Sequence, residues 1–130
     1  MAERRLQGIR VLVVDDDPDI LGSIGLALRG EGAETDQVGD GNAAVHSFQT
    51  SRPDIVVLDM MLPKRSGFLV LEKIQEAEDP PPVVMVTANQ GRRHMAYAQS
   101  LGVAAYLNKP VSLQRLLDVV AESVGRGAAG

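Results

Sequence analysis

Side chains able to do chemistry follow four short apolar runs of this sequence. They are Asp15, Asp16, Asp17, Asp59, Thr87 and Lys109. Carboxylates brought within about 4 Å of one another repel by about 4 kcal/mol per pair at an effective dielectric of 20. A hard divalent cation relieves this repulsion, and a site of carboxylates and water suits Mg²⁺ better than a soft metal. If the fold brings these side chains together, their types predict a magnesium site.

A threonine and a lysine beside such a site add the groups needed to handle phosphate. Together with Mg²⁺, the Lys109 ammonium and the Thr87 hydroxyl would hold the oxygens of a phosphoryl group. One carboxylate could then act as a nucleophile and form an aspartyl phosphate. Asp59 is the best candidate for that role, because it ends the central apolar run and apolar residues flank it.

Ordinary structural roles compete with this interpretation for each residue taken alone. Asp17 is expected to cap the helix that follows it, and Asp15 or Asp16 could equally cap that helix or face solvent. Asp59 could be a turn residue ahead of Pro63, and the threonine and lysine could be strand-end and surface residues. The functional interpretation therefore depends on their combined placement after successive apolar runs.

The elements that must position these side chains alternate regularly along the chain. Five apolar runs, of which the second is the weakest, have the composition of strands buried on both faces. These runs are Ile9–Val14, Ala33–Val38, Ile55–Leu58, Val83–Val86 and Ala104–Leu107. Segments of helical periodicity separate them, which predicts a doubly wound α/β domain with a parallel sheet. Ligands of such sheets bind beyond the carboxyl ends of the strands, where the chemically active side chains are expected.

Helix signals are clearest near the two ends of the chain. Asp17 as N-cap and Pro18 as the first helical residue predict where the first helix begins. Ser112 predicts the start of the last helix, and Gly125 lies just past its expected end. Apolar stripes predict two further helices between them, whereas the pattern over 92–101 is less clear because its apolar stripe is small.

Composition excludes several classes of protein. The 130 residues include no Cys, which excludes a disulfide framework, a thiolate zinc site and a cysteine nucleophile. A net charge of −4 and only two Phe and two Tyr weigh against direct nucleic-acid binding. No apolar run approaches the ~18 residues of a membrane span. We expect one cytoplasmic domain at 9–124, an N-terminal extension at 1–8, and a flexible tail or the start of a linker at 125–130.

Four stretches of sequence carry most of these features. They are VLVVDDDP at 11–18, PDIVVLDMMLP at 53–63, VVMVTA at 83–88 and GVAAYLNKP at 102–110. In combination they resemble the receiver domain of two-component response regulators, of which the chemotaxis regulator is the simplest relative. The resemblance runs from Ile9 to about Val124. It implies a flavodoxin-like fold with five parallel strands in the order 2-1-3-4-5 and five helices.

The resemblance also implies a role for each acidic residue of the site. Asp59 would be the phosphoacceptor and, with Asp15 and Asp16, would form the metal site. Asp16 would hold Mg²⁺ directly and Asp15 largely through water. The backbone carbonyl of Met61 would be the third protein ligand.

By the same resemblance, the remaining site residues would bind and report the phosphoryl group. Thr87 would bind it, Lys109 would pair with it, and the Lys109–Pro110 bond would be cis. Movement of Thr87 toward the new phosphoryl group would let Tyr106 rotate inward. The face built from the fourth helix, the fifth strand and the fifth helix would then bind a partner differently.

The resemblance implies protein partners rather than nucleic acid or membrane. A sensor histidine kinase or a phosphotransfer protein would donate the phosphoryl group, docking near the first helix. A downstream effector protein, or an output domain outside these residues, would receive the signal. Arg92, Arg93 and His94 could form a mobile partner-binding surface or simply belong to a poorly patterned helix.

Two positions that tune dephosphorylation in the family are Met61 and Asn89 in this chain. A methionine side chain cannot position an attacking water, whereas an asparagine side chain can. We therefore expect the phosphoryl group to last longer than a minute.

Two other functions remain open at this stage. A haloacid-dehalogenase-type phosphohydrolase also uses an aspartate after a strand, but its D-x-D-x-[TV] motif would end here at Asp19, and the length leaves no room for a cap domain. A scaffold that keeps the fold without phosphorylation is the second alternative, against which the complete set of site residues argues. An EF-hand and a nucleotide-binding loop are not supported, because the required glycines and glutamate are missing.

Overall fold

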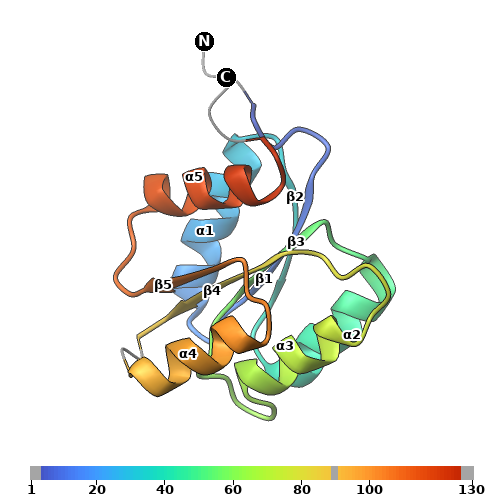
Figure 1. Ribbon diagram of the computed structural model, residues 1–130. Helices are drawn as coiled ribbons and strands as arrows, with labels where there is room; N and C mark the ends of the chain where they lie inside the picture. Colours follow the sequence, from blue (N-terminus) through green and yellow to red (C-terminus); the bar gives the residue numbers. More distant parts are fainter. Residues whose placement is uncertain (1–3, 89–90, 127–130) are drawn as a thin grey trace.

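The computed structural model describes residues 4–88 and 91–126. Within them, five parallel strands form one sheet in the order β2-β1-β3-β4-β5, and a helix follows each strand (Figure 1). The strands are β1 (Arg10–Val14), β2 (Glu34–Val38), β3 (Ile55–Leu58), β4 (Val83–Thr87) and β5 (Ala105–Asn108). The helices are α1 (Pro18–Gly30), α2 (Gly41–Ser51), α3 (Gly67–Gln75), α4 (Arg92–Ser100) and α5 (Leu113–Ser123). The predicted fold class and strand order are confirmed.

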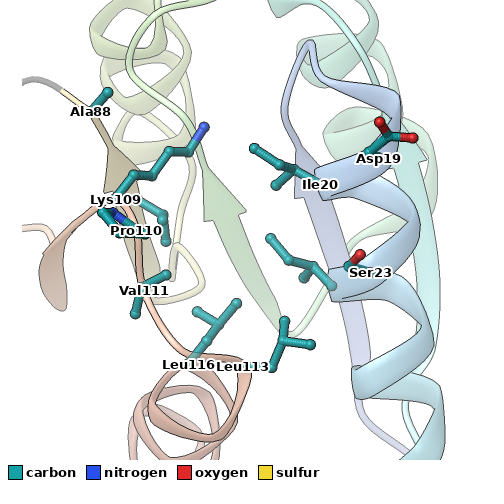
Figure 2. Close-up of a pocket in the computed structure, with 11 residues that line it drawn as sticks. Asp19, Ile20, Ser23, Ala88, Lys109, Pro110, Val111, Leu113 and Leu116 are labelled. Carbon is teal, nitrogen blue, oxygen red and sulfur yellow. The ribbon is translucent and has the colours of Figure 1, made fainter.

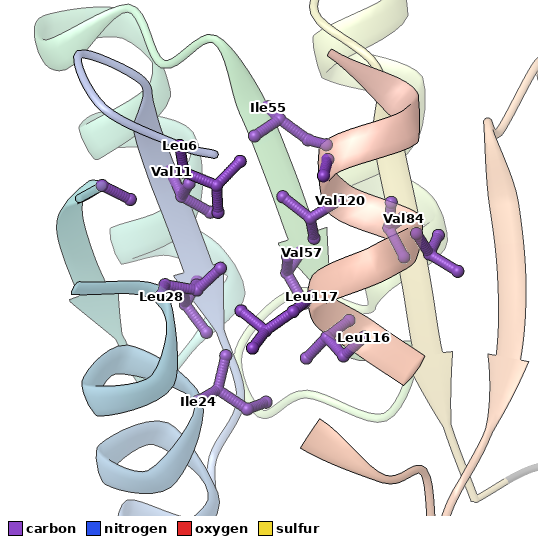
Figure 3. Packing of buried hydrophobic residues seen from close by; sticks show 14 of the residues in the cluster. Leu6, Val11, Ile24, Leu28, Ile55, Val57, Val84, Leu116, Leu117 and Val120 are labelled. Atoms are coloured by element: carbon purple, nitrogen blue, oxygen red, sulfur yellow. The ribbon is translucent and has the colours of Figure 1, made fainter. Parts of the chain in front are cut away.

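Helices cover both faces of the sheet, which explains why the strands are apolar without alternation. Helices α1 and α5 lie on one face, and α2, α3 and α4 lie on the other (Figure 1). Successive β1 side chains enter opposite cores, with Val11 and Val13 packed under α1 and α5, and Leu12 and Val14 under the other helices. Figure 3 shows the first core, where Leu116 of α5 lies among strand and α1 residues. Every central strand thus contributes to two cores at once.

Side-chain caps determine where most helices begin. The Asp17 carboxylate accepts hydrogen bonds from the N–H groups of Asp19 and Ile20, which confirms it as the N-cap of α1. Ser112 caps α5 in the same way through the Arg115 N–H. Ser66 caps α3 through the Leu69 N–H, although the sequence pattern did not single it out for this role. These caps satisfy backbone donors that would otherwise lack partners at the helix ends.

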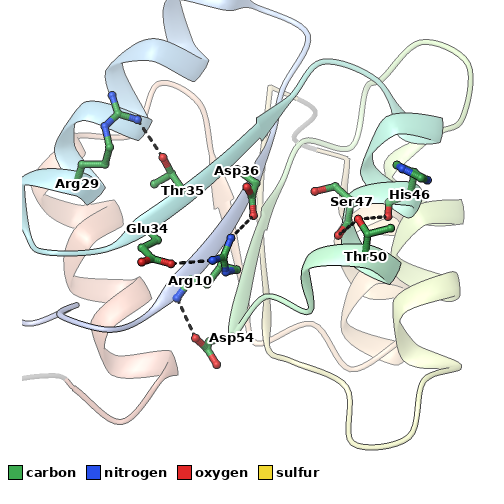
Figure 4. Close-up of polar contacts among 9 residues, drawn as sticks. All are labelled: Arg10, Arg29, Glu34, Thr35, Asp36, His46, Ser47, Thr50 and Asp54. Carbon is green, nitrogen blue, oxygen red and sulfur yellow. Dashed lines mark hydrogen bonds and ion pairs between the residues drawn. The ribbon is translucent and has the colours of Figure 1, made fainter.

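The weak second run forms a polar edge strand. Its side chains are held by basic residues of neighbouring elements: Arg10 pairs with Glu34 and Asp36, and Arg29 donates to Thr35 (Figure 4). Charged, partly exposed side chains are common on edge strands, where they discourage pairing with another sheet. This position explains why its apolar signal is weaker than that of the central strands.

The segment before β1 packs onto the folded core. Leu6 is fully buried among α1 and α5 residues, so the described part of the expected N-terminal extension, residues 4–8, packs against the domain. The Leu6 N–H donates to the Glu31 carbonyl at 2.9 Å, and Arg5 pairs with Asp118 at 3.0 Å. At the other end of the described chain, Arg126 donates to the Gln7 carbonyl. Residues 4–8 therefore contact both α5 and the loop that follows α1.

The unclear segment at 92–101 does form a helix, α4. Among its described residues, only Ala98 is buried, and no side chain caps its N-terminus at Gly91. Met95 is 36% exposed, which agrees with the small apolar stripe of this segment. In the described part of the chain, no helix is both long enough and apolar enough to span a bilayer.

Candidate functional site

Strand register places the two central aspartates side by side. Val14 of β1 pairs with Leu58 of β3, and each is followed directly by an aspartate. The Asp59 N–H donates to the Val14 carbonyl at 3.0 Å, which extends the ladder by one step. Asp15 and Asp59 are therefore held at adjacent positions on the carboxyl edge of the sheet, as the alternating pattern predicted.

The same edge carries the threonine and the lysine. Thr87 pairs with Asn108 in the register of β4 and β5, and the Lys109 N–H donates to the Thr87 carbonyl at 2.8 Å. The Thr87 side chain is fully buried. The Lys109–Pro110 peptide bond is cis, as the family resemblance implied.

The Lys109 ammonium joins the two buried carboxylates. Its Nζ lies 2.7 Å from Asp15 Oδ2 and 3.3 Å from Asp59 Oδ2. Both aspartates are nearly inaccessible, with exposures of 3% and 4%. Removing two carboxylates from water is costly, so a shared cation inside the site is needed to compensate them.

The lysine does not fully compensate Asp59. Burial raises the pKa of Asp59, and the Asp15 charge adds to this effect, while the Met61 N–H and the Lys109 ammonium oppose it. For Lys109, burial lowers the pKa, but the hydrogen bond to Asp15 and the two carboxylate charges outweigh burial and raise it. The site therefore keeps a charged lysine and an unfavourably desolvated Asp59 carboxylate.

Three carboxylates converge in a geometry that fits a hard cation. Among the described residues, one oxygen from each of Asp15, Asp16 and Asp59 lies within 4.8 Å of the other two. Asp16 is exposed, whereas the other two are buried, so the cluster opens to solvent on one side. An all-oxygen set with a solvent-facing side suits Mg²⁺, which retains several waters. Asp17 is not part of this cluster and serves as a helix cap.

Met61 contacts the site through its backbone. Its N–H donates to Asp59 Oδ1 at 3.2 Å, while its side chain is 60% exposed. The methionine side chain therefore contributes nothing that would hold a water at the carboxylate. Asn89, the other residue expected to tune dephosphorylation, lies outside the described residues.

Two glycines bring the loop after β3 against its neighbours. A Cβ at Gly67 would lie 2.3 Å from the Asp59 carbonyl oxygen, and the Gly67 N–H donates to the Met60 carbonyl. A Cβ at Gly41 would lie 2.1 Å from the Arg65 carbonyl oxygen. Local sequence patterns do not indicate this role of Gly67, because a close approach of two backbones leaves no pattern in the neighbouring residues.

An apolar groove leads away from the site between α1 and the start of α5. It is a cavity of about 640 Å³, and Figure 2 shows Ile20 of α1 on one side and Pro110, Val111 and Leu113 on the other. Lys109 also lines it, which connects the groove to the carboxylate site. On the opposite face of the sheet, the half-buried Tyr106 packs against the second core, and burial raises its pKa.

Comparison with known proteins identifies the family over most of the chain. A family model for the response regulator receiver domain matches residues 11–121. The probable transcriptional regulatory protein TcrX of Mycobacterium tuberculosis is 37% identical over 111 residues, which cover 85% of this chain and 47% of TcrX. The sensory transduction protein RegX3 of Mycolicibacterium smegmatis is 37% identical over 118 residues, which cover 91% of this chain and 51% of RegX3.

A solved structure has closely the same fold. The CheY-like response regulator receiver domain from Methanospirillum hungatei superimposes with a TM-score of 0.87 at 27% identity, covering 90% of this chain and 94% of that one. The chain spans about half the length of the curated relatives that it matches. The matched family model, the strand order and the acidic cluster agree, and the chain belongs to the receiver domains of two-component response regulators.

Proposed function

We propose that this receiver domain is a phosphorylation-activated switch that accepts a phosphoryl group on Asp59. The observation that supports this most directly is that Asp59 lies close to both the Lys109 ammonium and two further carboxylates. Its Oδ1 accepts the Met61 N–H, which orients the carboxylate. Members of this family are signalling proteins rather than conventional enzymes, which favours a phosphoacceptor over a dehalogenase-type phosphohydrolase.

The metal of this site is proposed to be Mg²⁺. Asp15, Asp16, Asp59 and the Met61 carbonyl would hold it, with Asp15 acting largely through water. When bound, Mg²⁺ supplies positive charge that offsets the charges of the carboxylates and of the phosphoryl oxygens. The carboxylate-only cluster and its exposed side at Asp16 support this choice of metal.

Phosphoryl transfer would follow from the positions of three side chains. An Asp59 oxygen attacks phosphorus in line, an O–P bond forms, and the N–P bond of the donor phosphohistidine breaks with its electron pair returning to the imidazole nitrogen. Lys109 neutralises charge on the transferring group, which it can reach from its position 3.3 Å from Asp59 Oδ2. The Thr87 hydroxyl then donates a hydrogen bond to a phosphoryl oxygen.

Output would use the face formed by α4, β5 and α5. Movement of Thr87 toward the phosphoryl group lets Tyr106 rotate inward, which changes that face for a partner. Shifting a two-state equilibrium from 1:99 to 99:1 needs about 5.5 kcal/mol. Two or three charge-assisted hydrogen bonds of about 1.5–3 kcal/mol each supply that amount.

The donor is proposed to be a sensor histidine kinase or a phosphotransfer protein that docks along the groove between α1 and α5. The groove is apolar, and Lys109 lines both the groove and the carboxylate site, so a partner seated there would lie close to Asp59. The receiving partner would be a separate effector protein or an output domain outside these residues. We further propose a phosphoryl lifetime longer than a minute, because the Met61 side chain cannot position water.

Incubation with acetyl phosphate and Mg²⁺, followed by mass spectrometry of the intact protein, tests this function. We expect the mass of one phosphoryl group to be added, and Asp59→Asn to prevent the addition. Asp54→Asn is a matched control, since Asp54 is an exposed aspartate that binds the Arg10 N–H at the far edge of the sheet. Phosphorylation of Asp59→Asn at the wild-type rate would overturn the proposal, and partner binding indifferent to phosphorylation would favour a scaffold.

A further inference from the structure

Helix α4 rests only lightly on the sheet. Of its nine residues, only Ala98 is buried, whereas α5 buries five of eleven. A helix with a single small buried residue gains little from apolar packing, which is the usual source of helix stability in proteins. Other contacts must therefore hold α4 in its position.

Those contacts form a seam of side chains between α3 and α4, which lie side by side in Figure 1. The Phe68 ring stacks on His94 at 5.8 Å between centroids and meets Tyr97 edge-on at 5.1 Å. The Tyr97 hydroxyl donates to the Glu72 carboxylate. One turn further along, the Gln75 side-chain amide donates to the Leu101 carbonyl at 2.6 Å.

Helical spacing places each set of seam residues on one face. Phe68, Glu72 and Gln75 are four and three residues apart on α3. Their partners are three and four residues apart: His94 and Tyr97 lie on α4, and Leu101 follows its last residue. The seam thus runs along both helices from the carboxyl edge of the sheet to its far end. It is aromatic and polar rather than aliphatic, so its strength depends on a few specific contacts.

The first residue of this seam, Phe68, lies next to a contact with the loop between β3 and α3, residues 59–66, which we call the acceptor loop. Gly67, next to Phe68, packs its backbone against the Asp59 carbonyl and donates its N–H to the Met60 carbonyl at 2.8 Å. This close approach leaves no space for a side chain at Gly67. A displacement of the acceptor loop therefore displaces the first turn of α3, and Phe68 with it.

We propose that the α3–α4 seam, with Phe68 at its head and the Tyr97–Glu72 hydrogen bond at its centre, transmits changes at Asp59 to α4. This inference rests on the proposed phosphorylation of Asp59. It adds a route that runs through helix contacts on one face of the sheet, separate from the route through Thr87 and Tyr106.

The first experiment measures the seam itself by hydrogen exchange of the α4 amides in Tyr97→Phe, Glu72→Ala and the double variant. Each single change removes one hydrogen bond, so we expect exchange about 3- to 10-fold faster. The double variant should exchange no faster than Glu72→Ala alone, because both changes remove the same bond. Additive effects of the two changes would overturn the assigned contact.

The second experiment measures transmission, using beryllofluoride with Mg²⁺ as a mimic of the aspartyl phosphate. In the wild type we expect the mimic to change exchange over 92–100. In Tyr97→Phe and Phe68→Ala the same change should shrink by about 2-fold or more. Gln99→Ala is the matched control, since Gln99 is exposed on the face of α4 that lies opposite the seam.

The outcomes separate this inference from the proposed function. If acetyl phosphate fails to modify wild-type Asp59, the proposed function fails and transmission fails with it. If Asp59 is modified and α4 responds equally in Tyr97→Phe and in the wild type, only the seam inference is overturned. A reduced response in Tyr97→Phe that still unfolds in urea as one cooperative transition supports it, since Tyr97→Phe keeps the ring and removes only the hydroxyl.

Discussion

Lys109 Nζ lies 2.7 Å from Asp15 Oδ2, across 94 residues of sequence. The same ammonium lies 3.3 Å from the Asp59 carboxylate, so Asp15 is its closer partner. The acceptor candidate is thereby the less tightly paired of the two buried carboxylates, and burial raises its pKa. Lys109 pairs with both carboxylates, but its weaker pairing with Asp59 leaves that carboxylate able to bind a second cation.

Asp59→Asn is expected to stabilise the fold in metal-free buffer. Burial disfavours the charged form of Asp59, and the nearby Asp15 charge adds to the cost. A group whose pKa is raised in the folded protein destabilises the fold when it is charged, so a neutral group of the same shape should raise the free energy of unfolding by about 1–2 kcal/mol. Urea unfolding in EDTA measures the difference.

Adding Mg²⁺ provides the control for this prediction. A metal that binds only the folded wild type stabilises it by mass action. The difference in unfolding free energy between Asp59→Asn and the wild type should therefore narrow or reverse. Lower stability of Asp59→Asn in EDTA would show that pairing with Lys109 outweighs desolvation.

Gly67→Ala is expected to disturb the acceptor loop. The new Cβ would meet the Asp59 carbonyl at 2.3 Å and the Met60 Cα at 2.6 Å, and both contacts are backbone. Overpacking of this kind costs about 1–3 kcal/mol and should slow phosphorylation by acetyl phosphate. Gly22→Ala is the matched control, because a Cβ there meets nothing within 4 Å and should stabilise α1 by up to about 1 kcal/mol.

Asp17→Ala and Asp16→Ala should separate the capping role from the metal role. Asp17 accepts hydrogen bonds from the first turn of α1, so its loss should cost about 1 kcal/mol of unfolding free energy. Magnesium affinity should fall markedly only for Asp16→Ala, whose carboxylate belongs to the cluster. A loss of magnesium affinity in Asp17→Ala as large as in Asp16→Ala would contradict this division.

Leu6→Ala is expected to destabilise the domain by about 2–4 kcal/mol. Leu6 is fully buried with Leu28 and Val120 in the core under α1 and α5, so truncation leaves a cavity (Figure 3). Denaturant unfolding measures the loss. Leu26→Ala on the exposed side of α1 serves for comparison, and equal effects of the two changes would mean that Leu6 contributes nothing to the core.

Local sequence was sufficient to predict much of the fold and the members of the site. Alternating apolar runs and helical stripes predicted the parallel sheet, and Asp17 and Ser112 predicted two helix starts, because capping is decided within three residues. Polar residues directly after buried strands indicated Asp15, Asp59 and Thr87, since parallel strands end at one edge. The strand order came from resemblance to a family rather than from pattern.

The way in which those residues meet depends on contacts between distant segments of the folded chain. Register across β1 and β3 put Asp15 beside Asp59, and the pairing of Lys109 with both carboxylates crosses 94 and 50 residues. The backbone contact at Gly67 and the seam between α3 and α4 likewise join distant segments. Sequence specifies local preferences because they depend on near neighbours along the chain. Long-range contacts depend on how whole elements pack, so their partners become visible only in the folded molecule.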